Sequence, residues 1–216
     1  MKHSSPRPGR PWVIPLADLD TPQTRARIKG LLSDGALIAY PTDTLYGLGG
    51  DFFNFGVHQR IDEFKERSDQ PYSVALWDPG EITFLASSIP EWFHSHSRKV
   101  FPGPFTLVFP ASAHMSPELL RGGSTIAVRV PGEPFPRKAM ARIGIPLVST
   151  SINRSGSPPL KDPARILKQF PDIDILIDAG PLPASRGSTI IDLNSMPPHV
   201  IRKGEGLRVL AELGLS

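Results

Sequence analysis

The sequence of 216 residues contains no cysteine, which excludes disulfide bonds and metal sites built on thiolates. It also has no apolar run approaching the roughly 20 residues that a helix needs to cross a bilayer. Residues 1–11 are basic and rich in proline, and they lack the apolar stretch of a signal peptide. We therefore predict a disordered lead-in over residues 1–11, a single domain over residues 12–216, and a cytoplasmic protein without a membrane partner.

Several motifs of known chemistry are absent as well. The sequence has no G-x-x-x-x-G-K-[ST] segment, which excludes a P-loop, and it has no evident Ser-His-Asp or G-x-S-x-G arrangement. The six histidines are scattered. His94 and His96 form the one close pair, but they lie on a predicted helix, where a spacing of two does not align side chains. No metal site made by protein side chains is predicted, and the aromatic residues form no array for stacking bases.

The net charge of +3 is mild and permits an anionic partner such as a nucleotide or RNA. Many enzymes without such partners are equally basic, so the charge alone does not identify one. The 25 prolines and 19 glycines are spread along the chain, which indicates many short loops rather than a low-complexity segment.

Hydrophobic periodicity and turn signals predict a mixture of helices and strands. The predicted helices span residues 21–33, 57–65, 90–100, 135–143 and 162–170. The predicted strands span residues 36–40, 72–77, 105–109, 125–130, 147–150, 173–177, 189–193 and 200–202. Because strands and helices do not alternate strictly, we predict an α/β fold with a twisted mixed β-sheet flanked by helices.

The most informative segment is 40–51, Y-P-T-D-T-L-Y-G-L-G-G-D, which follows the predicted strand 36–40. Pro41 cannot donate to a strand ladder, so the strand should end there. Thr42, Asp43 and Thr44 then supply polar groups, and the glycines after them allow tight turns or close approach to a ligand. α/β proteins tend to place ligands in such loops, although an ordinary strand-to-helix turn is the alternative.

Four further segments carry groups that bind phosphate, which requires fixed positive charge and hydroxyl or backbone donors. They contain Lys65 and Arg67 at a helix end, Thr125 and Arg129 on one face of a strand, the alternating Ser149, Ser151 and Asn153, and Arg202 near the C-terminus. Each has a structural alternative: a solvated helix end, a surface ion pair, or turn and capping chemistry.

In their order along the chain, these pieces resemble the YrdC/Sua5/YciO family, the threonylcarbamoyl-adenylate synthases and their paralogues. The resemblance runs from about residue 21 to residue 205. Each motif alone is weak, whereas seven in this order are specific. They occupy residues 41–49, 65–67, 102–106, 125–131, 151–156, 188–192 and 201–205.

The resemblance implies a twisted mixed sheet around a large, positively charged cavity, in the short single-domain form of the family. It implies a nucleotidyltransferase that uses ATP with Mg²⁺, L-threonine and bicarbonate to make threonylcarbamoyl-AMP and pyrophosphate. It further implies a partner transferase that uses this product for t6A modification of tRNA, and it is compatible with direct tRNA or double-stranded RNA contact.

The resemblance also implies roles for individual residues, none of them a nucleophile. It implies that ATP is bound by Lys65, Arg67, Thr125, Ser151, Asn153 and Arg202. It implies that L-threonine is bound by Thr44, Arg129, Ser149 and Ser188.

Three positions depart from the synthase pattern. Ser68 replaces a proline after Arg67, Pro159 replaces a serine that contacts the nucleotide, and Leu76 or Trp77 stands where a threonine-binding histidine is usual. The departures leave an alternative open: a YciO-like paralogue that binds nucleotide or RNA without threonine-dependent synthase activity.

Overall fold

A ten-stranded mixed sheet forms the centre of the computed structural model, which describes residues 11–66 and 71–215. Its strands are β1 Trp12–Pro15, β2 Ile38–Tyr40, β3 Gly47–Gly49, β4 Ser73–Ala75, β5 Phe105–Pro110, β6 Thr125–Arg129, β7 Leu147–Ser151, β8 Ile175–Asp178, β9 Thr189–Asp192 and β10 His199–Arg202. Their order across the sheet is β1-β8-β2-β3-β7-β4-β6-β5-β9-β10. The mixture of parallel and antiparallel pairs confirms the predicted α/β fold.

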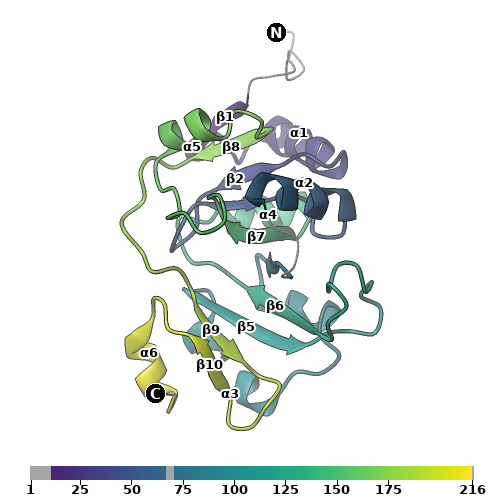
Figure 1. Cartoon of the computed structure of the whole chain (residues 1–216), viewed down its shortest axis with the longest axis vertical. Coiled ribbons are helices and arrows are strands. Elements are labelled where there is room, and N and C mark those ends of the chain that lie inside the picture. The colour runs from purple at the N-terminus through teal and green to yellow at the C-terminus, as the bar shows by residue number, and fades with distance from the viewer. Residues whose placement is uncertain (1–10, 67–70, 216) are drawn as a thin grey trace.

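Six α-helices and two short 3-10 helices accompany the sheet in the described part of the chain. The α-helices are α1 Pro22–Ser33, α2 Phe55–Lys65, α3 Glu91–Val100, α4 Arg137–Ile143, α5 Pro163–Gln169 and α6 Leu207–Glu212, and the 3-10 helices are Leu16–Asp18 and Pro79–Phe84. In Figure 1, α1, α2 and α5 lie with the half of the sheet that holds β1, β8 and β2, whereas α3 and α6 lie with β5, β9 and β10. The antiparallel pair β7 and β4 joins the two halves.

The first long helix shows how local sequence sets an element. Thr21 caps α1 by accepting a hydrogen bond from the Thr24 amide at 3.1 Å, and Pro22 occupies the first helical position, where no amide donor is needed. Ile28 and Leu32 face the core and are fully buried. The helix ends before Gly35, whose φ of +87° suits glycine. The predicted helix 21–33 is therefore confirmed.

The glycine-rich segment after β2 is a strand rather than a loop. β3 pairs antiparallel with β2, so that Tyr40 lies opposite Gly47 and Ile38 lies opposite Gly49. A Cβ on Gly47 would come within 2.8 Å of the Tyr40 ring, and one on Gly49 would come within 2.1 Å of the Val148 carbonyl oxygen. Close packing of β3 against Tyr40 and β7 therefore requires these two glycines.

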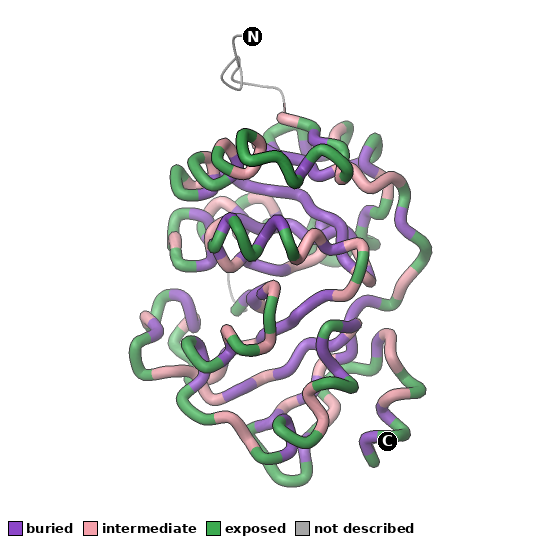
Figure 2. Tube along the Cα trace, turned by 180° about the vertical axis from the view of Figure 1, so that it is seen from behind, coloured by how far each residue is buried: buried purple, intermediate pink, exposed green. Residues whose placement is uncertain are grey.

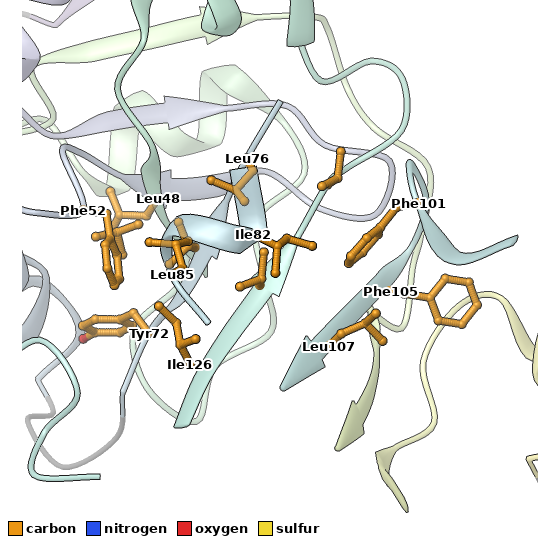
Figure 3. Close-up of a cluster of buried hydrophobic side chains, with 14 of the residues drawn as sticks. Leu48, Phe52, Tyr72, Leu76, Ile82, Leu85, Phe101, Phe105, Leu107 and Ile126 are labelled. Atoms are coloured by element: carbon orange, nitrogen blue, oxygen red, sulfur yellow. The ribbon is translucent and has the colours of Figure 1, made fainter. Parts of the chain in front are cut away.

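The sheet separates two hydrophobic clusters, and the strands that run between them are buried while most helix surfaces are exposed (Figure 2). β4 illustrates the separation, because successive side chains of a strand point to opposite faces. Val74 and Leu76 pack in the larger cluster, and Ala75 packs in the smaller one beside Tyr40 and Phe135. Figure 3 shows Leu76 in the larger cluster with Ile82 and Leu85.

Several elements differ from the sequence predictions. β1, β3, α6 and the two 3-10 helices were not predicted from the sequence. α4 begins at Arg137 rather than at residue 135, and the Phe135 ring packs edge-on to Tyr40 with 5.6 Å between ring centroids. The disordered lead-in was predicted over residues 1–11, and residues 1–10 lie outside the described part of the chain. Among the described helices, none is both long and apolar enough to span a bilayer.

A polar cavity at the centre of the sheet

A cavity of about 380 Å³ lies on one face of the sheet, bordered by residues from strands of both halves. β3 and β7 contribute from one half, and β4, β5, β6 and β9 contribute from the other. Hydroxyl groups are prominent on its walls, which include Thr44, Ser73, Thr106, Ser149, Thr150, Ser151, Ser155 and Ser188. Such a surface offers many donors and acceptors to a polar ligand.

Basic side chains also line the cavity. Four basic side chains border it, and no acidic side chain is found among the described residues on its wall. The four are Lys65, Arg129, Arg186 and Arg202. Arg129 is paired with Asp43, which lies outside the wall, and the positive charges that line the cavity favour an anionic ligand.

Arg129, at the end of β6, is held by the loop after β2. One of its terminal nitrogens donates to the Asp43 carboxylate at 3.0 Å and to the Thr44 hydroxyl at 3.1 Å. Asp43 also accepts the Gly132 amide at 2.9 Å. Arg129 is 8% exposed, and its Nε is buried without a partner among the described atoms. The guanidinium is thus fixed in place and retains donor capacity for a ligand carboxylate.

Lys65, the last residue of α2, is 3% exposed and supports the turn after β7. Its Nζ donates to the Ser151 carbonyl at 2.7 Å, and to the carbonyl and side-chain oxygens of Asn153 at 3.2 and 3.0 Å. The Ser151 hydroxyl also donates to Asn153 Oδ1, at 2.6 Å. These bonds hold the turn against the cavity wall and keep a buried positive charge beside it.

The opposite part of the wall joins β5, β9 and β10. The Thr106 and Ser188 hydroxyls are hydrogen-bonded at 2.8 Å, and Arg202 donates to the Ser188 carbonyl through Nε at 3.2 Å and one terminal nitrogen at 2.9 Å. Burial and the charge of Arg129 lower the pKa of Arg202 below its ordinary value. An anion bound here would relieve the repulsion between the two guanidinium groups.

Most of the predicted site residues meet at this cavity, which collects segments far apart in the sequence. It is bordered by Thr44, Lys65, Arg129, Ser149, Ser151, Asn153, Ser188 and Arg202. Thr125 lies at the start of β6 and does not border the cavity, although strand alternation puts it on the same face as Ala127 and Arg129. Arg67 and Ser68 lie outside the described residues.

The sequence predicted no site role for Asp43, Thr106 or Arg186, and it offered Ser73 only as a possible substitute for the missing histidine. Asp43 belongs to the polar segment 40–51, so its type and place were visible, but its partner Arg129 is 86 positions away. Ser73 donates to the Ser149 carbonyl at 2.6 Å, a contact that depends on the pairing of β4 with β7. Arg186 lies just before the motif 188–192, and no other feature of the sequence indicated a ligand-binding role for it.

The structure corrects the position suggested for the missing histidine. Leu76 is 1% exposed and packs in the larger hydrophobic cluster, and Trp77 packs against the smaller one; neither borders the cavity. Ala75 lies on the face of β4 that also carries Ser73, and its Cα is paired with that of Arg129. Ala75 is thus the position on β4 from which a longer side chain such as histidine would project beside Arg129, whereas its own methyl group is buried in the smaller cluster and does not border the cavity. Pro159 does border the cavity.

Nothing in the described part of the chain resembles a metal centre: no three histidine, aspartate or glutamate side chains gather there. A divalent cation bound together with a polyphosphate would have to be held mainly by that ligand, as Mg²⁺ commonly is.

Comparisons with known proteins identify relatives over most of the chain. A family model named for Sua5, YciO and YrdC, with the description "Telomere recombination", matches residues 30–204. A threonylcarbamoyl-AMP synthase of Pyrococcus abyssi is 34% identical over 178 residues, which cover 81% of this chain and 52% of that protein. A putative threonylcarbamoyl-AMP synthase of Mycobacterium tuberculosis is 31% identical over 193 residues, covering 87% of this chain and 88% of the relative.

Solved structures agree in fold. The crystal structure of P. abyssi Sua5 complexed with L-threonine superposes with a TM-score of 0.83 at 28% identity, covering 94% of this chain and 60% of that one. The crystal structure of Escherichia coli YciO has a TM-score of 0.77 at 26% identity, covering 92% and 97%. The chain thus spans only about half the length of the P. abyssi synthase but nearly all of YciO.

Proposed function

Because this chain belongs to the family named for Sua5, YciO and YrdC, we propose that it is a threonylcarbamoyl-AMP synthase. The observation that carries the proposal is the cavity around Arg129. Its charged wall, with Lys65 and Arg202, suits a polyphosphate, and its hydroxyl-lined wall, with Thr44, Ser149 and Ser188, suits an amino acid. The substrates are ATP, L-threonine and bicarbonate, and the products are threonylcarbamoyl-AMP, pyrophosphate and water.

The chemistry requires two bond-forming steps. The threonine amine attacks the carbon of bicarbonate and water leaves, which gives a carbamate. A carbamate oxygen then attacks the α-phosphorus of ATP, and the bond to the pyrophosphate group breaks. Neither step needs a nucleophilic side chain, so the protein acts by holding the reactants together and by stabilising charge on the departing pyrophosphate.

The charged wall suits the nucleotide. In this proposal Lys65, Arg67 and Arg202 bind the triphosphate, and Thr125, Ser151 and Asn153 bind the nucleotide around it. Lys65 is buried next to the turn at residues 151–153, so that its charge acts in an environment that screens it less than water does. Magnesium enters with ATP.

The hydroxyl-lined wall suits the amino acid. Arg129 pairs with the threonine carboxylate, and Thr44, Ser149 and Ser188 surround the rest of the substrate. All four are nearly buried, with exposed fractions of 8, 2, 6 and 5%. Buried donors discriminate well between ligands, because a ligand that cannot pair with them leaves them unsatisfied.

Beyond the reaction itself, we propose that a transferase accepts the threonylcarbamoyl group for t6A modification of tRNA in the cytoplasm. Contact of this chain with RNA would be weak and electrostatic, because the net charge is only +3 and the sequence shows no aromatic array for stacking bases.

A second candidate function is a YciO-like protein that binds nucleotide or RNA without threonine-dependent synthesis. One observation favours it: no histidine borders the cavity among residues 11–66 and 71–215, and Ala75 occupies the β4 position beside Arg129.

The two functions are separated by incubating the protein with ATP, Mg²⁺ and bicarbonate, with and without L-threonine, and measuring pyrophosphate. We expect release that depends on threonine and on bicarbonate. ATP binding without threonine-dependent release would refute the synthase and support the second candidate. L-Serine and L-valine, each lacking one substituent of the threonine side chain, test whether the amino-acid wall is selective.

A further inference from the structure

We propose that Arg186 is an additional ligand for the phosphate chain of the nucleotide and acts together with Arg202. This inference rests on the function proposed above. Both residues border the cavity, and Arg186 was not among the residues expected from the sequence to bind ATP. It is exposed, and no hydrogen bond or ion pair of its side chain is found in the described structure.

The other three basic residues on the wall are held by the protein. Lys65 is bonded to the turn at residues 151–153, Arg129 to Asp43, and Arg202 to Ser188. Arg186 differs because its backbone is fixed while its side chain has no such restraint. A long side chain of this kind can move onto a ligand after the ligand has entered.

The backbone of Arg186 is fixed by Glu205. The Arg186 amide donates to Glu205 Oε1 at 2.9 Å, and the Glu205 amide donates to the Gly187 carbonyl at 2.8 Å. The two segments 186–189 and 202–205 therefore lie against each other. Close packing extends to Gly204, where a Cβ would come within 2.3 Å of the Gly187 carbonyl oxygen.

This pairing places Gly187, the residue after Arg186, next to the guanidinium of Arg202. A Cβ on Gly187 would lie 3.5 Å from a terminal nitrogen of Arg202, so Arg186 is one residue away from that group. Glu205 uses one carboxylate oxygen on the Arg186 amide, and no acidic residue lies on the described cavity wall to neutralise the pair. Two arginines that border the same cavity, with no acidic residue on its described wall, are suited to a polyphosphate, which each guanidinium can bind through two parallel hydrogen bonds.

The test compares Arg186→Ala, Arg186→Lys and wild type in calorimetric titrations with ATP, inorganic tripolyphosphate and AMP. Arg208→Ala is the matched control, because Arg208 is an exposed arginine on α6 that does not border the cavity. We expect Arg186→Ala to weaken ATP and tripolyphosphate binding by about five- to twentyfold, with AMP changed by less than about twofold. Arg186→Lys should restore part of the loss, because lysine keeps the charge but not the fork of donors.

Equal ATP affinity for wild type and Arg186→Ala would overturn the inference, as would an equal loss for AMP and ATP. The same titrations distinguish failure of the Arg186 site from failure of the proposed synthase function. A wild type that binds tripolyphosphate through Arg186 but neither ATP nor AMP would refute the synthase and keep this anion site. A wild type that binds none of the three ligands would refute both.

Discussion

Arg129 and Asp43 form an ion pair at 3.0 Å in which both side chains are about one-tenth exposed, at 10 and 11%. The pair joins the end of β6 to the polar loop after β2, and the Gly132 amide holds the second carboxylate oxygen. Asp43 therefore sets the orientation of the guanidinium that we assign to the threonine carboxylate.

Asp43→Asn should weaken L-threonine binding by about 1–2 kcal/mol, the scale of a lost charge-assisted hydrogen bond, and should leave ATP affinity unchanged. The amide side chain keeps the volume but removes the charge that orients Arg129. Calorimetry with each substrate measures the split. Asp192→Asn serves as control, because that carboxylate bonds within its own turn at Asn194. An equal loss for both substrates would contradict a specific role for Asp43.

Lys65→Ala should weaken ATP binding by about 1.5–3 kcal/mol and also lower the free energy of unfolding by about 1–3 kcal/mol. The second effect follows because the three oxygens of Ser151 and Asn153 lose their shared donor. Calorimetry and urea unfolding measure the two quantities.

Two further variants accompany the Lys65 prediction. Arg67→Ala should weaken ATP binding by a similar amount. Lys168→Ala removes an exposed lysine on α5 and should change neither quantity. Unaltered nucleotide affinity in both the Lys65 and Arg67 variants would return this pair to a purely structural role.

Leu76→His should not improve threonine binding, and it should lower the free energy of unfolding by about 3 kcal/mol, since it buries a polar ring in the larger cluster. Leu76→Met keeps the volume and should cost less than about 1.5 kcal/mol. Urea unfolding and threonine titration test both variants. A gain in threonine affinity from Leu76→His would mean that β4 presents the opposite face to the cavity.

Gly49→Ala should destabilise the protein severely, because the new Cβ would lie 2.1 Å from the Val148 backbone oxygen, which the sheet holds in place. Gly30→Ala is the matched control. Gly30 lies inside α1 with nothing within 4 Å of the position of a Cβ, so alanine should raise the free energy of unfolding by up to about 1 kcal/mol. Thermal and urea unfolding distinguish the two. Similar stabilities for both variants would show that β3 can move away from β7.

His58 should make the stability depend on pH. It is fully buried; its Nε2 lies 2.7 Å from the Phe52 carbonyl, and its Nδ1 has no partner among the described atoms. Burial, reinforced by the charge of Arg121, lowers the pKa of His58 below its ordinary value of 6.5, although the bond to Phe52 raises it. The neutral ring is therefore the form that the folded protein accommodates.

Because the folded pKa lies below the unfolded one, the unfolded state binds the additional proton as the pH falls. The contribution of His58 is thus complete above about pH 6.5 and is lost as the pH falls toward the folded pKa. Urea unfolding of wild type and His58→Gln between pH 7.5 and 5.5 tests this, and the difference between them should shrink at low pH. A constant difference would exclude His58 as the source.

Much of this architecture is visible in the linear order of residues. Apolar runs with turn signals located α1, α2, α3, α5 and most long strands, because their periodicity and caps are local properties. The segment 40–51, the pair 65 and 67 and the alternating residues 149–153 were also recognised from local chemistry. Hydroxyl and basic side chains next to strand ends indicate a ligand site before any tertiary contact is known.

Sequence alone determined which residue types are available and which of them share a strand face, whereas tertiary structure decided which face meets the cavity. Alternation groups Ser73 with Ala75 and Val74 with Leu76, but only the pairing of β4 with β6 and β7 turns the first pair toward Arg129. The tertiary structure likewise brings Asp43 to Arg129, and the Arg186 amide to Glu205, although the two members of each pair are remote in sequence. Strand order and register are long-range properties, so no local pattern could have assigned these contacts.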